Sequence, residues 1–189
     1  MKVSEADIII VPGLNDSGPE HWQSRWEAKL SNASRIIHID FGIPSRMLWT
    51  SAIVEAVSVA TRPVILVAHS IGVAAIAHAA PALSGKVAGA FLVALSDWNR
   101  PEVIPGLTHD FAPLPREPLP FPSMMVASRN DPYCDYDVAG DYANCWGSYL
   151  MDAGDSAHIN VESGHGPWPE GTMIFARFLS GLKVPEVKA

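Results

Sequence analysis

The stretch Val64-Ile-Leu-Val-Ala-His-Ser70-Ile-Gly72-Val-Ala decides the fold that we expect for this chain of 189 residues. Its apolar first half, Val64–Ala68, predicts a strand buried on both faces, as in the centre of a parallel sheet. The Ala-rich segment Ile71–Ala80 predicts a helix that Pro81 ends. The chain is therefore expected to turn sharply at Ser70, between a buried strand and a helix.

Small residues stand two positions before and two positions after Ser70. This is the pattern G-x-S-x-G, with Ala68 in place of the first glycine. We expect the backbones at Ala68 and Gly72 to pack against each other, which only small side chains permit. The turn lifts the Ser70 hydroxyl above the sheet edge, where it can act as a nucleophile; the alternative is an ordinary serine at a helix start. His69 should point elsewhere, because neighbours on a strand alternate sides, and serve in packing or hydrogen bonding.

Two backbone N–H groups near this turn are candidates for stabilising a negatively charged oxygen. The N–H of Ile71 lies at the amino end of the new helix, where backbone donors are unpaired. The loop Val11-Pro-Gly-Leu-Asn-Asp-Ser-Gly18 follows the first strand, and Leu14 is our candidate for the second donor. Gly13 lets this backbone approach a substrate, and Asn15 is a candidate substrate contact. A plain strand-to-helix turn is the alternative for this loop.

Apolar runs of strand length alternate with longer segments of helical period, which predicts a parallel sheet covered on both faces. The expected strands are Asp7–Val11, Arg35–Ile39, Val64–Ala68, Val87–Leu95, Ser123–Ala127 and Ser148–Asp152. The expected helices are Pro19–Leu30, Arg46–Ala60, Ile71–Ala80, Tyr136–Trp146 and Thr172–Leu182. Right-handed crossovers give the strand order 2-1-3-4-5-6. With the turn at the serine, this predicts a three-layer α/β/α sandwich of the α/β-hydrolase fold, as a single domain over residues 1–189 without a large cap domain.

The segment Asp97–Pro122 interrupts this alternation. It holds seven prolines, at positions 101, 105, 113, 115, 118, 120 and 122. Proline at this density favours an extended and stiff path. We expect the segment to cross the carboxyl edge of the sheet, where a lid would lie. A surface connection with no role in binding is the alternative.

A serine nucleophile needs a base, and the base needs a carboxylate to orient it. In this fold the order along the chain is Ser, then Asp or Glu, then His. Asp131 directly follows the fifth strand and is our candidate acid, with Asp97 as the alternative. His158, shortly after the last strand, is our candidate base, with His165 in a glycine-rich stretch as the alternative. The remaining histidines are expected to be structural or exposed: His21, His38, His78 and His109.

Composition and charge narrow the possible partners. The net charge is −7 and the 13 Lys and Arg residues are scattered, so neither nucleic acid nor a membrane surface is an expected partner. Cys134 and Cys145 are too few for a disulfide framework or a zinc site, and we expect reduced thiols. The apolar run Ile8–Val11 is too short for a signal peptide core or a membrane span, so we expect a cytoplasmic protein. No metal and no cofactor are expected.

Four segments of the chain carry a resemblance to a known family. They are Val11–Trp22, Ala68–Gly72, Ala127–Cys134, and Ala157–Asn160 with Gly166–Gly171. They resemble the retinoblastoma-binding-protein-9-like family of small serine hydrolases, especially its compact bacterial branch. The resemblance extends over nearly the whole chain and implies the α/β-hydrolase fold, with Ser70 as nucleophile, Asp131 as acid and His158 as base. That family commonly has glycine just before this histidine, whereas Ala157 stands here, which asks more of the local backbone.

Together these residues predict a serine hydrolase of esterase type that cleaves an ester, thioester or amide of a small acyl compound through an acyl-enzyme on Ser70. Aromatic residues near the candidate loops either line a partly apolar cleft or pack in the core; they are Trp22, Trp98, Tyr133 and Trp168. One alternative is a catalytically weak protein with this fold that binds another protein, although the sequence does not support a protein partner. Another is acyl transfer or a lyase reaction at the same site.

Overall fold

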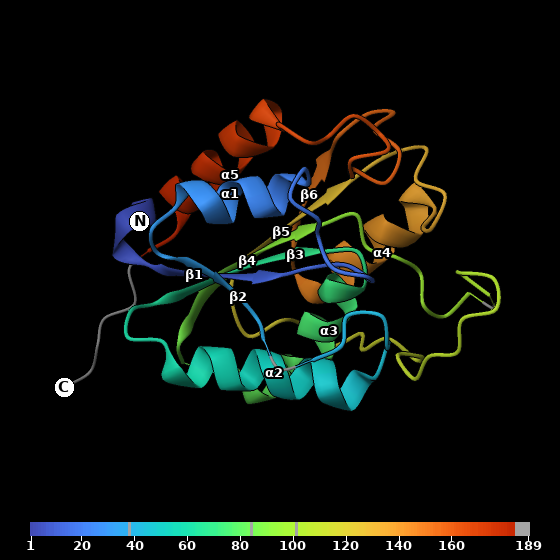
Figure 1. Cartoon of the computed structure of the whole chain (residues 1–189), viewed down its shortest axis with the longest axis horizontal. Helices are drawn as coiled ribbons and strands as arrows, with labels where there is room; N and C mark the ends of the chain where they lie inside the picture. Colours follow the sequence, from blue (N-terminus) through green and yellow to red (C-terminus); the bar gives the residue numbers. More distant parts are fainter. Residues whose placement is uncertain (38, 84, 101, 184–189) are drawn as a thin grey trace.

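The fold is a parallel sheet between two layers of helices (Figure 1). The computed structural model describes residues 1–37, 39–83, 85–100 and 102–183. Within these residues the strands are β1 (Asp7–Val11), β2 (Ala33–Arg35), β3 (Val64–His69), β4 (Val87–Val93), β5 (Ser123–Ala127) and β6 (Tyr149–Asp152). They form one sheet in the order β2-β1-β3-β4-β5-β6, and each neighbouring pair is parallel. The predicted strand order is confirmed.

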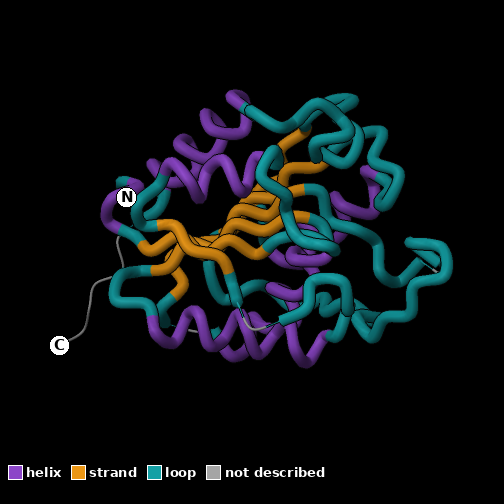
Figure 2. Tube along the Cα trace, viewed as in Figure 1, coloured by secondary structure: helices purple, strands orange, loops and turns teal. Residues whose placement is uncertain are grey.

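Helices cover both faces of the sheet. They are α1 (Trp22–Lys29), α2 (Arg46–Val59), α3 (Ile71–Ala79), α4 (Tyr136–Trp146) and α5 (Pro169–Gly181), with the short 3-10 helices η1 (Val3–Glu5) and η2 (Ala80–Ala82). Helices α1 and α5 lie on one face, and α2, α3 and α4 lie on the other. This is the predicted three-layer sandwich of the α/β-hydrolase fold. Figure 2 shows the longest loops gathered at one end of the sheet, beyond the carboxyl ends of the strands.

Two apolar clusters, one on each face of the sheet, explain the unbroken apolar runs of the central strands. All six residues of β3 are buried. Ile65 and Val67 pack in the cluster with α1 and α5, whereas Leu66 and Ala68 pack in the cluster with α2, α3 and α4. Because successive side chains point to opposite faces, a strand covered on both faces is apolar at every position. No helix in the described part of the chain has the length and apolar character to span a membrane.

The predicted second strand is misplaced. We expected Arg35–Ile39, but β2 spans Ala33–Arg35 and pairs with residues 8–10 of β1. Beyond β2, Ile36 is buried in the core while Ile37 is 61% exposed. Ile36 still donates its N–H to the Ile10 carbonyl of β1 at 3.1 Å, but the chain leaves the sheet directly after it. The prediction placed the strand too late because it followed the apolar residues Ile36 and Ile37. Residue 38, and with it the expectation for His38, lies outside the described residues.

The proline-rich segment has no helix or strand among its described residues. Figure 1 shows it in green to yellow, beginning at the carboxyl end of the sheet. Phe111 and Leu114 are buried in the cluster with α2, α3 and α4. Farther along, the Pro115 carbonyl accepts a hydrogen bond from Trp146 Nε1 at 2.8 Å. The path is therefore extended, as predicted. Much of the segment packs on the helix layer, and Ile104 also lines the cavity at the carboxyl edge of the sheet.

Gly72 allows α3 to begin in contact with the end of β1. A Cβ atom on Gly72 would lie 2.6 Å from the carbonyl oxygens of both Val11 and Pro12. Val11 ends β1 and its carbonyl also accepts a hydrogen bond from Gln23 Nε2, and Pro12 directly follows it, so these backbone oxygens cannot move aside cheaply. The reason that we predicted for a small residue at this position is thus corrected: the nearest obstacle is the end of β1, not Ala68.

We predict that Gly72→Ala lowers the free energy of unfolding by about 1–3 kcal/mol, as overpacking of a rigid contact does. Urea denaturation followed by tryptophan fluorescence measures this change. Gly181→Ala is the matched control, because a Cβ there meets nothing within 4 Å; its stability should stay within about 1 kcal/mol of the parent. A Gly72→Ala protein as stable as the parent would contradict the close contact.

Candidate active site

Ser70 lies at the turn between β3 and α3, and its backbone holds a rare conformation. Its φ is 55° and its ψ is −123°, a combination that is strained for residues with a side chain. The Ser70 N–H donates to the Val93 carbonyl at the end of β4 at 3.0 Å, so the neighbouring strand holds the turn in place. Ser70 is 8% exposed and lines a cavity. The predicted sharp turn at this serine is confirmed.

Asp131 and His158 follow β5 and β6, which are neighbours in the sheet. His158 Nδ1 is 2.9 Å from Asp131 Oδ2 and 3.0 Å from Oδ1. Both residues are buried. The carboxylate also accepts a hydrogen bond from the Tyr133 N–H at 2.9 Å. Because Nδ1 donates to a carboxylate, the neutral ring carries its proton there and leaves Nε2 as an acceptor.

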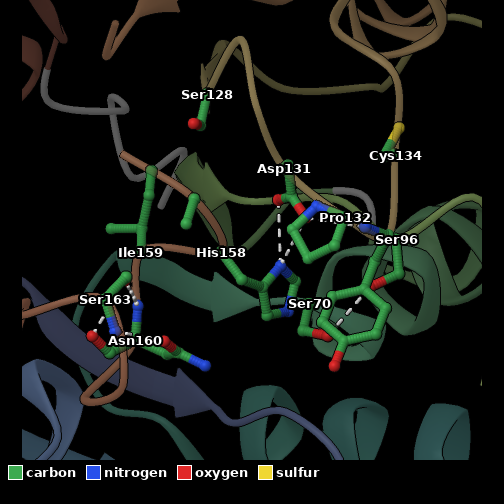
Figure 3. Close-up of polar contacts among 12 residues, drawn as sticks. Ser70, Ser96, Ser128, Asp131, Pro132, Cys134, His158, Ile159, Asn160 and Ser163 are labelled. Atoms are coloured by element: carbon green, nitrogen blue, oxygen red, sulfur yellow. Dashed lines mark hydrogen bonds and ion pairs between the residues drawn. The ribbon is translucent and has the colours of Figure 1, made fainter. Parts of the chain in front are cut away.

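The His158 ring lies between Asp131 and Ser70, as Figure 3 shows. Ser70 Oγ shares a hydrogen bond of 2.9 Å with Ser96 Oγ, and Ser96 is buried. Sequence analysis missed Ser96, although it considered the adjacent Asp97. A serine in a loop carries no signal of its own, and the only cue is its place just beyond the carboxyl end of β4.

Hydrogen bonding between the loops that follow β5 and β6 fixes how Asp131 and His158 meet. The Asn130 Oδ1 accepts the N–H of Ala157 at 2.7 Å, so the residue before the acid holds the residue before the base. Ala157 has a φ of 45°. This left-handed conformation favours glycine, and alanine adopts it at a cost in backbone strain. The backbone strain that we expected from alanine in place of glycine at position 157 is therefore present.

The loop after β1 brings its backbone close to Ser70. A Cβ atom on Gly13 would lie 3.3 Å from Ser70 Cβ, so a larger residue would crowd the serine. Leu14 lines the cavity, and Ile71 directly follows Ser70. Neither the Leu14 N–H nor the Ile71 N–H donates to another protein group within the described residues. Both predicted donors are thus available to a bound oxygen.

Gln23, a second residue that sequence analysis missed, ties this loop to the sheet. It is fully buried, and its Nε2 donates to the carbonyls of Val11 and Val67, each at 3.1 Å. Its Oε1 accepts a hydrogen bond of 2.6 Å from Ser17 Oγ in the loop. Because one buried amide forms hydrogen bonds with both strands and with the loop, it fixes the loop backbone relative to β1 and β3.

Three histidine rings pack together beside the cavity. The His69 ring centroid is 4.9 Å from that of His21 and 4.8 Å from that of His158. His69 Nε2–H donates to the His158 carbonyl at 2.9 Å, which agrees with the hydrogen-bonding role predicted for it. Burial lowers the pKa of His69 well below its usual value and the pKa of His21 to about 4. His21, expected to be structural or exposed, lines the cavity as a neutral ring.

The alternative acid and base lie apart from this arrangement. Asp97 Oδ1 accepts the Asn99 N–H at 3.2 Å. His165 Nδ1 shares a hydrogen bond of 2.9 Å with Ser163 Oγ. Within the described residues, Asp97 forms no hydrogen bond with a histidine ring, whereas Asp131 does, and His165 does not line the cavity. The geometry brings Asp131 and His158 together and leaves both alternatives out.

The cavity has a volume of about 410 Å³. Asn15 and Tyr133, two of the expected substrate contacts, line it. The three tryptophans proposed as contacts are buried in the core instead: Trp22, Trp98 and Trp168. Of the two interpretations left open for the aromatic residues, core packing therefore holds for the tryptophans. Trp22 supports the site indirectly, because its Nε1 donates to the Ile159 carbonyl at 3.0 Å, one residue after His158.

The chemistry that these groups permit follows from their arrangement. Ser70, His158 and Leu14 line one cavity. The buried Asp131 carboxylate lies behind the His158 ring and binds its Nδ1, and Ile71 directly follows Ser70. Such a set can remove a proton from the hydroxyl and stabilise the charged ring that results. Among the residues that the structure describes, no group of three or more His, Cys, Asp and Glu side chains is placed to hold a metal ion.

Comparison with solved structures supports the fold over almost the full chain. A protein described as a YdeN-like hydrolase from Pectobacterium atrosepticum is 36% identical, with a TM-score of 0.82 over 94% of this chain and 93% of its own. The ydeN gene product of B. subtilis is 17% identical, with a TM-score of 0.76 over 93% of this chain and 99% of its own. Esterase 2 of Thermogutta terrifontis is 15% identical, with a TM-score of 0.65 over 95% of this chain and 85% of its own. The last two likenesses concern the fold alone.

The match to a family model concerns the residues proposed for catalysis. A search of curated proteins gave no significant match. Residues 8–177, which include the turn at Ser70 and the loops of Asp131 and His158, match the model of the serine hydrolases. The chain belongs to the serine hydrolase family.

Proposed function

We propose that this serine hydrolase is of esterase type and forms an acyl-enzyme on Ser70. The observation that carries the proposal is the hydrogen bond between His158 Nδ1 and the Asp131 carboxylate, beside the cavity that Ser70 lines. His158 Nε2 takes the hydroxyl proton while Ser70 Oγ attacks the carbonyl carbon of the substrate. The imidazolium then protonates the leaving group, and Asp131 stabilises its positive charge in the meantime.

The backbone donors of Leu14 and Ile71 stabilise the oxyanion that forms in each step. They are held by the sheet and by the start of α3, so they need little reorganisation when negative charge develops. In the second step His158 takes a proton from water, and the resulting hydroxide attacks the acyl carbonyl. Ser70 then leaves and regains its proton from the imidazolium.

The size of the cavity supports a small acyl substrate. Its volume of about 410 Å³ lies in the range of small-molecule sites. We propose a carboxylic ester first, since thioesters and amides are cleaved by the same steps with a different leaving group. Within the serine hydrolases, the segments quoted above favour the retinoblastoma-binding-protein-9-like branch. A cytoplasmic location stays a prediction.

A role as a binding module without catalysis is not favoured. Binding another protein would not require a buried carboxylate against a histidine next to a strained serine, whereas acyl transfer chemistry requires all three. Transfer of the acyl group to an alcohol or amine would use the same acyl-enzyme with another acceptor. Product analysis with an added alcohol separates that reaction from hydrolysis.

We predict that Ser70→Ala lowers kcat for p-nitrophenyl acetate by a factor on the order of 10⁶, as loss of the nucleophile does in a serine protease. A fluorophosphonate probe should label the parent protein and leave Ser70→Ala unlabelled. Ser123→Ala serves as the control, since Ser123 lies at the start of β5, away from the cavity. Hydrolysis by Ser70→Ala at the parent rate would rule out this nucleophile.

We predict that Asp131→Asn lowers kcat by a factor on the order of 10⁴, because an amide beside Nδ1 favours the ring tautomer that cannot accept the Ser70 proton. Asp97→Asn is the matched control and should retain most of the parent activity, since Asp97 contacts Asn99 and not His158. Initial rates with the same ester, at matched thermal stability, measure both. The reverse order of effects would assign the acid to Asp97.

We predict that Ser96→Ala lowers kcat about threefold to tenfold with little change in KM. A decrease of this size corresponds to the loss of one neutral hydrogen bond. When Ser70 donates to His158, Ser96 is the donor that holds the Ser70 oxygen in place. Ser96→Thr keeps the hydroxyl and should restore most of the rate. Ser123→Ala again serves as the control, because it also breaks a hydrogen bond between two serines, with Ser148, that is partly buried and lies away from the cavity. An unchanged kcat in Ser96→Ala would remove Ser96 from the positioning of Ser70.

A further inference from the structure

We propose that His21 is a substrate-binding residue that donates one N–H to a neutral acceptor oxygen of the substrate, such as a hydroxyl or an amide carbonyl near the scissile bond. The inference rests on the proposed function, since it assigns a second anchor to the same cavity. It concerns which acyl compounds are preferred and not how the bond is broken.

The hydrogen bonding of His21 determines which ring nitrogen is free. His21 precedes α1, and its Nδ1 accepts the Gln23 N–H at 3.2 Å as the cap of this helix. The proton of the neutral ring therefore lies on Nε2. Burial lowers the pKa of His21 to about 4, so the ring remains a neutral, single donor near pH 7.

The surroundings of His21 leave this donor for a ligand. The residue is 6% exposed, yet it lines the same cavity as Ser70. No hydrogen bond to Nε2 is formed within the described residues, whereas Nδ1 is satisfied. Among the described residues, the fully buried side-chain atoms that lack a hydrogen-bond partner do not include His21 Nε2, so this donor opens into the cavity, where water or a ligand can accept from it. The ring is held in place by its cap bond and by contact with the His69 ring, so the donor is preorganised.

The charges around the cavity favour a neutral acceptor over an anionic one. Asp16 and Glu162 both line it. Arg35, which reaches this loop, is already paired with Asp16 and Glu27. Among the described residues no Lys or Arg lines the cavity, so a carboxylate on the substrate would meet this acidic rim without a cation there, which disfavours its binding. A short hydroxyacyl ester fits the donor and the charge together.

The test compares two esters of nearly equal size, p-nitrophenyl 3-hydroxybutyrate and p-nitrophenyl butyrate. The parent protein should prefer the hydroxy ester in kcat/KM. His21→Asn keeps an acceptor for the Gln23 N–H, because asparagine is a good helix cap, but its shorter amide cannot reach as the ring does. We predict that the preference, as a ratio of kcat/KM values, falls about threefold to tenfold in His21→Asn, the worth of one hydrogen bond.

His109→Asn is the matched control. His109 Nδ1 accepts the Phe111 N–H two residues on, in the same way as His21, but His109 does not line the cavity in the described structure. Its ratio should equal that of the parent. A parent ratio of one or less, or an unchanged ratio in His21→Asn, would overturn the proposal, as would an equal fall for both esters. Ser70→Ala tests the proposed function separately, because loss of Ser70 should abolish hydrolysis of both esters whatever stands at position 21.

Discussion

The close approach of α3 to the end of β1 is the constraint on which the rest of the site depends. At Gly72 the helix backbone meets the Val11 and Pro12 carbonyls at a distance that leaves no room for a side chain. The same contact brings Ser70 against Gly13 in the loop after β1. One packing interaction, between the amino end of α3 and the end of β1, thus places both the nucleophile and the backbone donors. A larger residue at position 72 would push α3 away from β1 and so move Ser70 away from the loop that carries Leu14. Catalytic donors that are fixed in this way need not reorganise when charge develops.

The acid and the base depend on a different feature, the register of the last two strands. Ala127 and Asp152 are paired at the carboxyl ends of β5 and β6, so the two following loops leave the sheet at the same height. The bond from the Ala157 N–H to Asn130 then joins the loops just before Asp131 and His158. Two loops that are short and tied to each other hold their side chains more precisely than either would alone.

Sequence alone could predict what depends on chain order and on residue type. The strand order and the turn at Ser70 follow from apolar runs and small residues, and Asp131 and His158 follow from their places after late strands. Ser96 and Gln23 could not be found in this way, because a serine or glutamine acquires its role only from a neighbour distant in the chain. The tryptophans could be placed near the candidate loops from the sequence. Whether each ring faces the cavity or the core depends on packing, which the sequence does not show.

The proposed catalytic site holds both strained backbone conformations and uncharged histidine rings. Ser70 has a positive φ, as do Ala157 and Ile159 on either side of His158, and such conformations persist only where the surroundings impose them. The fully buried strand β3 and the hydrogen bonds between loops supply that support here. Burial also keeps His21 and His69 uncharged beside His158. A second positive ring at that distance would oppose protonation of the base. Because both neighbours stay neutral, the charge that forms on His158 is opposed by no ring and is attracted by Asp131, which is the condition that proton transfer from Ser70 requires.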